Sequence, residues 1–284
     1  MKLPTITKRQ QEILKLLYRY RFLNRIQIQA LMNHKDRKTI NLWLRDLKEK
    51  NYVEWIYSTH FAEKTKPAIY YIALNGVRFL KQQVYVATDG EEYEAYLLEE
   101  LRKRYRESSR SRTFTDHCLL IADCCISLEA KTKDTGNKLS YSYVTKADYI
   151  DPDNEYHFLH ESELIYPDLC FVKQERKKGE DLTTSYLLEV FDPTFPRYRI
   201  KKRLSNYIEY LDNGEWQSET ENDEPPIILL ACPRTSDPIY AKRRTRGLLA
   251  DIWEHDDEDR PQIRFATIDK LKEHGVTGKI WEEA

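Results

Sequence analysis

Apolar side chains recur at helical spacing over the first fifty residues, and the pattern then changes to that of strands. Ile13, Leu14 and Leu17 lie on one face of a helix that Thr7 can cap, and Asn24 can cap a second, shorter helix. The pattern predicts, in order, helices at 8–22, 25–32 and 36–50, strands at 52–57 and 68–74, and a further helix at 77–84. We therefore expect a small domain of helices and one hairpin over residues 5–85.

The third predicted helix combines one apolar face with one basic face. Ile40, Leu44 and Leu47 would be buried. The opposite face, with the residue just before the helix, carries Lys35, Arg37, Lys38, Asn41, Arg45 and Lys48. Such a row of cationic and amide groups suits a helix that reaches phosphates and base edges in a DNA major groove, although most charged helix faces are simply solvated. Lys64 and Lys66 would add positive charge at the tip of the predicted hairpin.

The charge is distributed unevenly along the chain. Residues 1–85 hold 17 Lys/Arg and 6 Asp/Glu, a net charge of +11, whereas the whole chain carries -1 and residues 86–284 therefore carry -12. A basic first part joined to an acidic remainder predicts that the first part binds a polyanion, most simply nucleic acid.

No apolar run approaches the roughly 18 residues that a membrane span needs. The first residues lead into no signal-peptide core. We expect a cytoplasmic protein that does not contact membranes.

The remainder of the chain predicts helices and strands that alternate around one mixed sheet. The expected elements are a helix from Thr115, strands at 139–144, 164–172 and 185–191, a helix at 199–211, a strand at 226–231, a helix at 237–253 and a strand at 262–268. Residues 86–112 would form a connecting helix and a linker. The fold class is therefore α/β (α+β) with two domains, at 5–85 and 113–284.

Two of these strands each carry a carboxylate, at Asp168 and at Glu189. If the strands are neighbours, the two carboxylates lie together, and like charges in a partly buried site raise each other's pKa. A divalent cation such as Mg²⁺ or Mn²⁺ would relieve this repulsion. The alternative is that both are ordinary strand carboxylates facing water. His117, His157 and His160 are expected to be satisfied polar residues rather than metal ligands.

Both halves resemble known families. Residues 5–85 look like the winged helix-turn-helix DNA-binding family, with the segment Ile72-Ala73-Leu74-Asn75-Gly76 leading into the last helix. The element order of the second domain, with Pro167-Asp168 and Glu189 on adjacent strands, resembles the PD-(D/E)xK nuclease superfamily of restriction-endonuclease-like fold. In that superfamily the Asp and Glu bind Mg²⁺ and a lysine assists the attacking water. In this chain Phe191 occupies the position of that lysine. Lys202 is therefore the candidate for the role of the lysine.

The combination of these features is similar to the replication-relaxation family of plasmid and mobile-element proteins. Arg203 lies four residues before Tyr207, at a position where proteins of that family tend to have Lys. The resemblance implies a protein that docks on double-stranded DNA and carries a metal-dependent endonuclease or nickase-like domain, with Asp168, Glu189 and Lys202 as its catalytic residues. The alternative is an inactive replication or transcription regulator that uses the nuclease-like fold to dimerise or to bind a partner. A homodimer and replication or mobilisation proteins are the further partners that the resemblance implies.

Overall fold

The computed structural model divides the chain into two compact units, Met1–Ala122 (unit 1) and Asp123–Ala284 (unit 2). The structure describes residues 3–58, 64–87, 97–99, 101, 104, 107–135, 138–151, 153–160, 162–177, 180–214, 216–217, 224–255 and 260–284. The division falls inside helix α6 (Arg112–Thr135) rather than in the predicted linker at 86–112, most of which lies outside the described residues.

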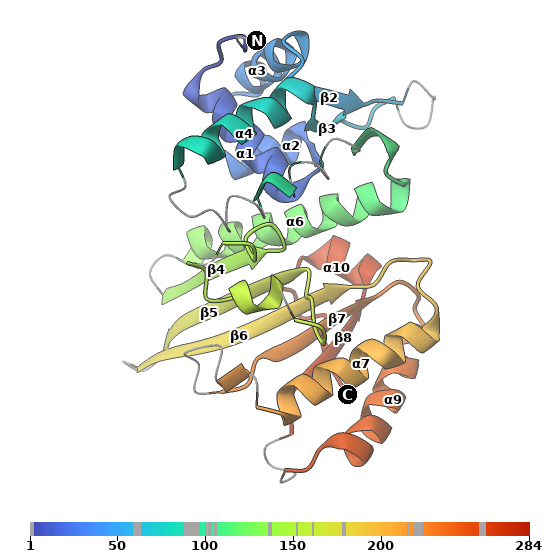
Figure 1. Cartoon of the computed structure of the whole chain (residues 1–284). Helices are drawn as coiled ribbons and strands as arrows, with labels where there is room; N and C mark the ends of the chain where they lie inside the picture. Colours follow the sequence, from blue (N-terminus) through green and yellow to red (C-terminus); the bar gives the residue numbers. More distant parts are fainter. Residues whose placement is uncertain are drawn as a thin grey trace. The chain divides into compact units, whose positions relative to one another are not determined.

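Unit 1 contains the predicted order of three helices, two paired strands and a further helix (Figure 1). Its elements are α1 (Lys8–Tyr20), β1 (Leu23–Asn24), α2 (Arg25–Leu31), α3 (Arg37–Glu49), β2 (Val53–Ile56), β3 (Ile69–Ile72), α4 (Leu74–Ala87), a 3₁₀ turn (Glu107–Ser109) and the first half of α6. Thr7 and Asn24 each form a capping box, and the carboxylate of Asp36 accepts hydrogen bonds from the backbone N–H groups of Lys38 and Thr39. The caps confirm where the three helices begin.

Strand β3 lies between β1 and β2 in a small antiparallel sheet. Helix α4 begins earlier than predicted, because the Asn75 N–H donates to the Asn51 carbonyl and brings the chain back against the end of α3. A Cβ atom at Gly76 would overlap the Tyr52 carbonyl oxygen, so this close approach requires glycine.

The start of α6 belongs to unit 1 because its apolar side packs there. Cys118 forms a buried cluster with Phe22, Ile69 and Tyr71. Just before α6, the fully buried Glu107 accepts two hydrogen bonds from the Arg21 guanidinium, at 2.8 and 2.9 Å. These contacts explain why the division lies beyond the segment that was predicted as a linker.

Unit 2 is built on a mixed six-stranded sheet in the order β4-β5-β6-β7-β8-β9. Its elements are the second half of α6, β4 (Leu139–Thr145), a 3₁₀ turn (His157–His160), β5 (Leu169–Lys177), β6 (Glu180–Val190), α7 (Arg197–Asp212), β7 (Ile227–Cys232), α9 (Asp237–Ile252), β8 (Ile263–Thr267), α10 (Ile268–His274) and β9 (Glu282–Glu283). Strand β5 is antiparallel to both neighbours, whereas β6, β7 and β8 are parallel. Helices therefore connect the parallel strands, as such connections require.

Helices α7 and α9 pack together on one face of this sheet (Figure 1). Leu187, Ile228 and Phe265 belong to the buried cluster that these helices cover, and the intervening Leu188 and Leu229 are buried on the other face. Both faces of the central strands are therefore covered.

Strands β5 and β6 extend through residues 173–177 and 180–184, which belong to the segment that the sequence predicted as a loop. Arg176 and Asp181 form a bidentate ion pair across this hairpin at 2.8 and 2.9 Å, and the threonines of β6 favour strand. Helix α10 and strand β9 were not predicted. No helix in the described parts of the chain is long and apolar enough to cross a membrane.

Candidate functional site

Asp168 and Glu189 lie next to each other on the sheet of unit 2, as predicted. Leu169 pairs with Leu188, and the N–H of Asp168 donates to the Leu188 carbonyl at 2.8 Å. Asp168 also accepts a hydrogen bond through Oδ2 from the N–H of Val190, at 2.8 Å. The two carboxylate residues are only 5% and 6% exposed. The antiparallel register thus fixes two buried acids at the end of the hairpin.

A lysine that the sequence analysis did not single out neutralises Asp168. Lys146 follows β4 directly, and its Nζ lies 2.6 Å from Asp168 Oδ1 and 4.9 Å from the centre of the Tyr166 ring. Burial lowers the pKa of Lys146, but the neighbouring charge of Asp168 more than offsets this, so the pKa is raised. The side chain of Lys146 as a whole is still 40% exposed.

Helix α7 supplies the second cation. Arg203 Nε lies 3.1 Å from Glu189 Oε1. Burial raises the pKa of Glu189, Arg203 opposes this rise, and the charge of Asp168 adds to it. The Tyr207 hydroxyl is close enough to stabilise the ionised Glu189, but it forms no well-aligned hydrogen bond, and Glu189 Oε2 is buried without such a bond among the described residues.

The structure brings Arg203, rather than Lys202, to the two acids. Lys202 is exposed on α7. Phe191, at the position where the nuclease pattern has lysine, is 1% exposed and stacks on Phe195 with ring centres 5.5 Å apart. Position 191 therefore serves the core, and the cations of the site come from Lys146 and Arg203.

The carboxylate oxygens of Asp168 and Glu189 fit a hard divalent cation such as Mg²⁺, which can also bind phosphate. Mg²⁺ is commonly held by one or two carboxylates, with water and substrate phosphate completing its coordination. Asp168 and Glu189 provide the two carboxylates, and the buried Oε2 of Glu189 retains an acceptor site. Within the described residues no group of three or more His, Cys, Asp or Glu side chains is arranged to hold a metal. Lys146 and Arg203 also balance the two negative charges, so a cation must compete with them.

The histidines considered in the sequence lie elsewhere in the fold. His157 and His160 occupy the 3₁₀ turn, where the Nδ1 atom of His157 lies 2.9 Å from the Tyr149 carbonyl oxygen. His117 is on α6.

The basic face of α3 lies at the surface of unit 1. Lys35, Arg37, Lys38 and Arg45 are exposed, while the buried Ile40, Leu44 and Leu47 hold the opposite face of the helix. Asn41 and Lys48 are half-buried. Arg37, Lys38 and Arg45 are therefore open to solvent on α3, whereas Lys48 forms an ion pair with Glu54.

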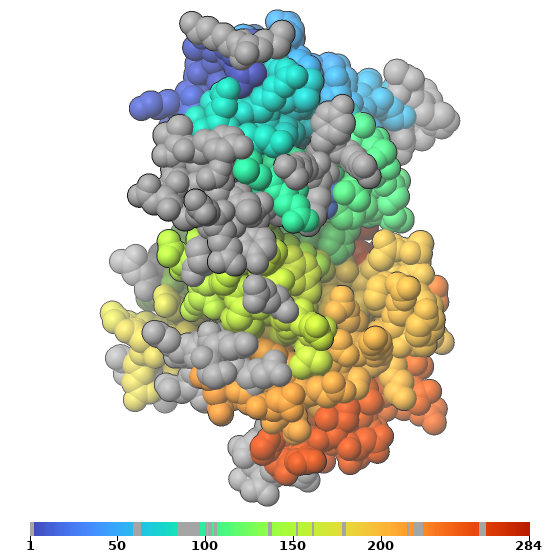
Figure 2. Space-filling model, viewed as in Figure 1, coloured from blue at the N-terminus to red at the C-terminus, as the bar shows by residue number. Residues whose placement is uncertain are grey.

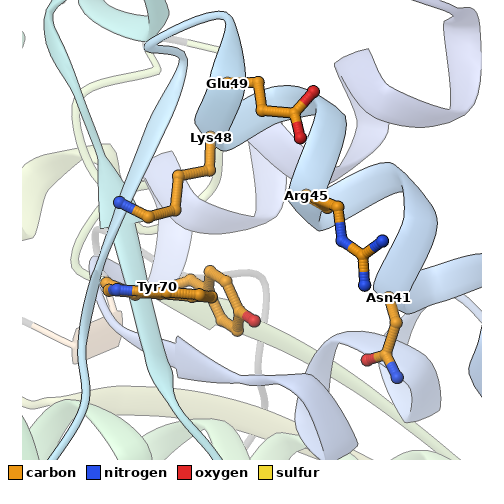
Figure 3. Close-up of a pocket in the computed structure, with 6 residues that line it drawn as sticks. Asn41, Arg45, Lys48, Glu49 and Tyr70 are labelled. Atoms are coloured by element: carbon orange, nitrogen blue, oxygen red, sulfur yellow. The ribbon is translucent and has the colours of Figure 1, made fainter.

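A pocket of about 570 Å³ lies between α3 and the strands β2 and β3. Its lining residues are Asn41, Arg45, Lys48, Glu49, Trp55 and Tyr70. Figure 3 shows Asn41 and Arg45 along α3, with Tyr70 across from them on the strands. Trp55 is 44% exposed, and Lys48 Nζ lies 4.8 Å from the centre of its ring. Sequence analysis missed these aromatic groups because they were counted only as strand residues.

The hairpin lysines are also placed at the surface. Lys64 and Lys66 are exposed, and the Lys64 carbonyl accepts a hydrogen bond from the Tyr57 hydroxyl at 3.1 Å. This bond ties the described end of the loop to the residue that follows β2.

Comparison with known proteins gives one family. The family model described as replication-relaxation matches residues 14–223, which is more than half of the chain and includes both the α3 surface and the Asp168–Glu189 centre. No curated protein and no solved structure matches the chain. The family suggests a role in the replication or mobilisation of mobile elements, a setting consistent with DNA and replication proteins as partners. By this match, the chain belongs to the replication-relaxation family.

Proposed function

We propose that this protein binds double-stranded DNA of a plasmid or other mobile element through unit 1, acting as a winged helix-turn-helix module. The exposed cationic row on α3 supports this proposal, because it combines phosphate-binding groups with an amide, Asn41, that can reach a base edge. The pocket beside it adds an exposed aromatic face at Trp55. The net charge of +11 over residues 1–85 would attract DNA over a longer range.

Unit 2 is proposed to carry an endonuclease or nickase centre at Asp168 and Glu189. The observation that carries this proposal is the pair of buried carboxylates on adjacent strands, one with an oxygen that has no well-formed hydrogen bond. The order of helices and strands from α6 to β8 also supports this proposal, because it is the order that resembles the PD-(D/E)xK nucleases.

Each residue of this centre has a physical role in the proposed reaction. The Val190 N–H fixes the orientation of Asp168, and Arg203 fixes that of Glu189. Lys146 would place its ammonium group against the phosphate and offset the negative charge that develops there. A Mg²⁺ or Mn²⁺ held by Asp168 and Glu189 would polarise the phosphoryl oxygen and lower the pKa of water.

A second function is an inactive regulator of replication or transcription that uses unit 2 to dimerise or to bind a partner. The buried Phe191 favours it, because the lysine of the nuclease pattern is replaced by a core side chain. The balanced charges of the centre also favour it, since a cation gains less from two acids that are already paired.

Nicking of supercoiled plasmid DNA tests the proposal. The substrate carries the origin region of the element that encodes the protein, and Mg²⁺ or Mn²⁺ is added. Asp168→Asn removes one carboxylate charge with little change in shape. Asp181→Asn is the matched control, because Asp181 is an exposed acid on the same hairpin.

Nicking by the wild type and by Asp181→Asn, but not by Asp168→Asn, is the expected result. Equal nicking by Asp168→Asn would exclude the Asp168–Glu189 centre. If none of the proteins nicks DNA although all bind it, the regulator is the correct function.

A further inference from the structure

Helices α7 and α9 expose a dense group of cations on unit 2. Five of the seven residues in 197–203 and four of the five in 242–246 are Lys or Arg, although residues 86–284 carry a net charge of -12. Besides Arg197, which is paired with Asp237, the exposed members are Arg199, Lys201, Lys202, Arg243, Arg244 and Arg246, and we call these six residues the α7–α9 basic surface. Figure 2 shows both helices, amber and orange-red, at the surface of unit 2.

One aromatic ring joins the two helices at their N-terminal ends. The Arg197 guanidinium lies 5.4 Å from the centre of the Tyr240 ring, and that of Arg244 lies 5.3 Å from the same ring. Arg197 also contacts the buried Asp237, with Nε 3.0 Å from Oδ1. Asp237 and Tyr240 thus both contact Arg197, and Tyr240 also contacts Arg244.

Within the described residues, the α7–α9 basic surface itself has no carboxylate partner. Across the described parts of the chain, none of its six residues forms an ion pair or a hydrogen bond with a carboxylate. Like charges held close on rigid helices repel one another, and a bound polyanion removes this repulsion while releasing counterions. The surface thus has the electrostatic character of a polyanion site.

Two further features favour a nucleic acid over a small anion. Tyr198 and Ile239, on the same two helices, are 67% and 73% exposed, and they offer apolar surface to sugars and bases. Gly247 lies about one turn after Arg244, and no atom other than those of its chain neighbours and its own helix backbone lies within 4 Å of where its Cβ would be. Glycine inside a helix destabilises it, and here no packing contact requires it, so the absent side chain leaves room for a ligand to approach.

We propose that the α7–α9 basic surface binds the phosphodiester backbone of DNA, as a second contact beside that of α3. This inference rests on the proposed DNA-binding function. It does not depend on whether the Asp168–Glu189 centre is active.

The salt dependence of DNA affinity tests this proposal on the full-length protein. The variant Lys201→Gln/Arg244→Gln removes one cation from each helix, and Gln keeps a similar helix propensity. The control Lys131→Gln/Lys272→Gln removes the same charge from exposed positions of α6 and α10. Affinity for a labelled duplex of mixed sequence is measured by fluorescence anisotropy over a series of salt concentrations.

The slope of log affinity against log salt should fall by about two units in Lys201→Gln/Arg244→Gln, since each phosphate contact contributes about 0.9. It should change little in the control. A slope equal to that of the wild type, or an equal fall in the control, would overturn the α7–α9 site while leaving DNA binding by unit 1 intact. If the wild type shows no salt-dependent affinity for DNA, the proposed function and this inference both fail.

Discussion

Removal of the Asp168 carboxylate should destabilise unit 2 through one buried hydrogen bond more than through the loss of charge. In the wild type the Val190 N–H donates to the Asp168 carboxylate at 2.8 Å. In Asp168→Ala it loses this acceptor inside the protein. An unsatisfied buried donor costs about 1–3 kcal/mol. The ion pair with Lys146 adds less, about 0–1 kcal/mol, because that side chain is 40% exposed and screened by water.

The expected loss for Asp168→Ala is therefore about 1–4 kcal/mol of unfolding free energy. Asp168→Asn should lose much less, because the amide oxygen can still accept from Val190 and the repulsion of Glu189 is relieved. Urea denaturation at neutral pH gives the global value, and hydrogen exchange of the Val190 amide gives the local one.

Two outcomes would refute this reasoning. The first is an Asp168→Ala variant as stable as the wild type, with an equally protected Val190 amide. The second is an Asp168→Asn variant that loses as much stability as Asp168→Ala. Asp181→Ala provides the baseline, because its ion pair with Arg176 is exposed and a change within about 0.5 kcal/mol is expected.

Three further predictions concern unit 1. Arg37→Ala/Arg45→Ala should reduce the salt slope of DNA binding by about two units without lowering the melting temperature, and an unchanged slope would remove α3 from the DNA interface. Gly76→Ala should cost about 1–3 kcal/mol in urea denaturation, because its Cβ would overlap a backbone carbonyl oxygen that cannot move freely. The hydrogen bond from the Thr39 hydroxyl lowers the pKa of Asp36, so its capping contribution is complete above the unfolded pKa and is lost as the pH falls through the lowered folded value. The stability difference between wild type and Asp36→Ala should therefore be present at neutral pH and vanish in strong acid, and a difference that persists there would contradict the sign.

Local signals sufficed for much of the fold. The caps Thr7 and Asn24 act within one turn of chain, so the helices they begin could be predicted from short sequence patterns. The pairing of Asp168 and Glu189 could also be predicted, because two apolar runs joined by a hairpin must lie side by side.

Other features depend on contacts that no short pattern records. Lys146 lies in a segment without periodicity and becomes a site residue only because β4 ends beside Asp168. Lys202 and Arg203 differ by about 100° around α7, and only packing of the helix on the sheet decides which one meets Glu189. Arg176 and Asp181 stabilise the longer hairpin only once its strands have paired.

The basic surface of α7 and α9 also depends on contacts that no short sequence pattern records. In the sequence, the net charge of -12 over residues 86–284 placed the expected polyanion contact in the basic first part of the chain. The fold instead brings the basic segments 197–203 and 242–246, forty residues apart in the chain, onto two packed helices. The net charge of this part of the chain therefore does not describe how charge is distributed over the surface of unit 2.

The most direct test of the Asp168–Glu189 centre is the yield of nicked circles from supercoiled plasmid in the presence of Mg²⁺, compared among wild type, Glu189→Gln and Asp181→Asn at equal bound DNA. Nicked product with the wild type and Asp181→Asn, and none with Glu189→Gln, is the result that a metal-dependent nicking centre at these carboxylates predicts. Equal product from Glu189→Gln and the wild type would contradict it.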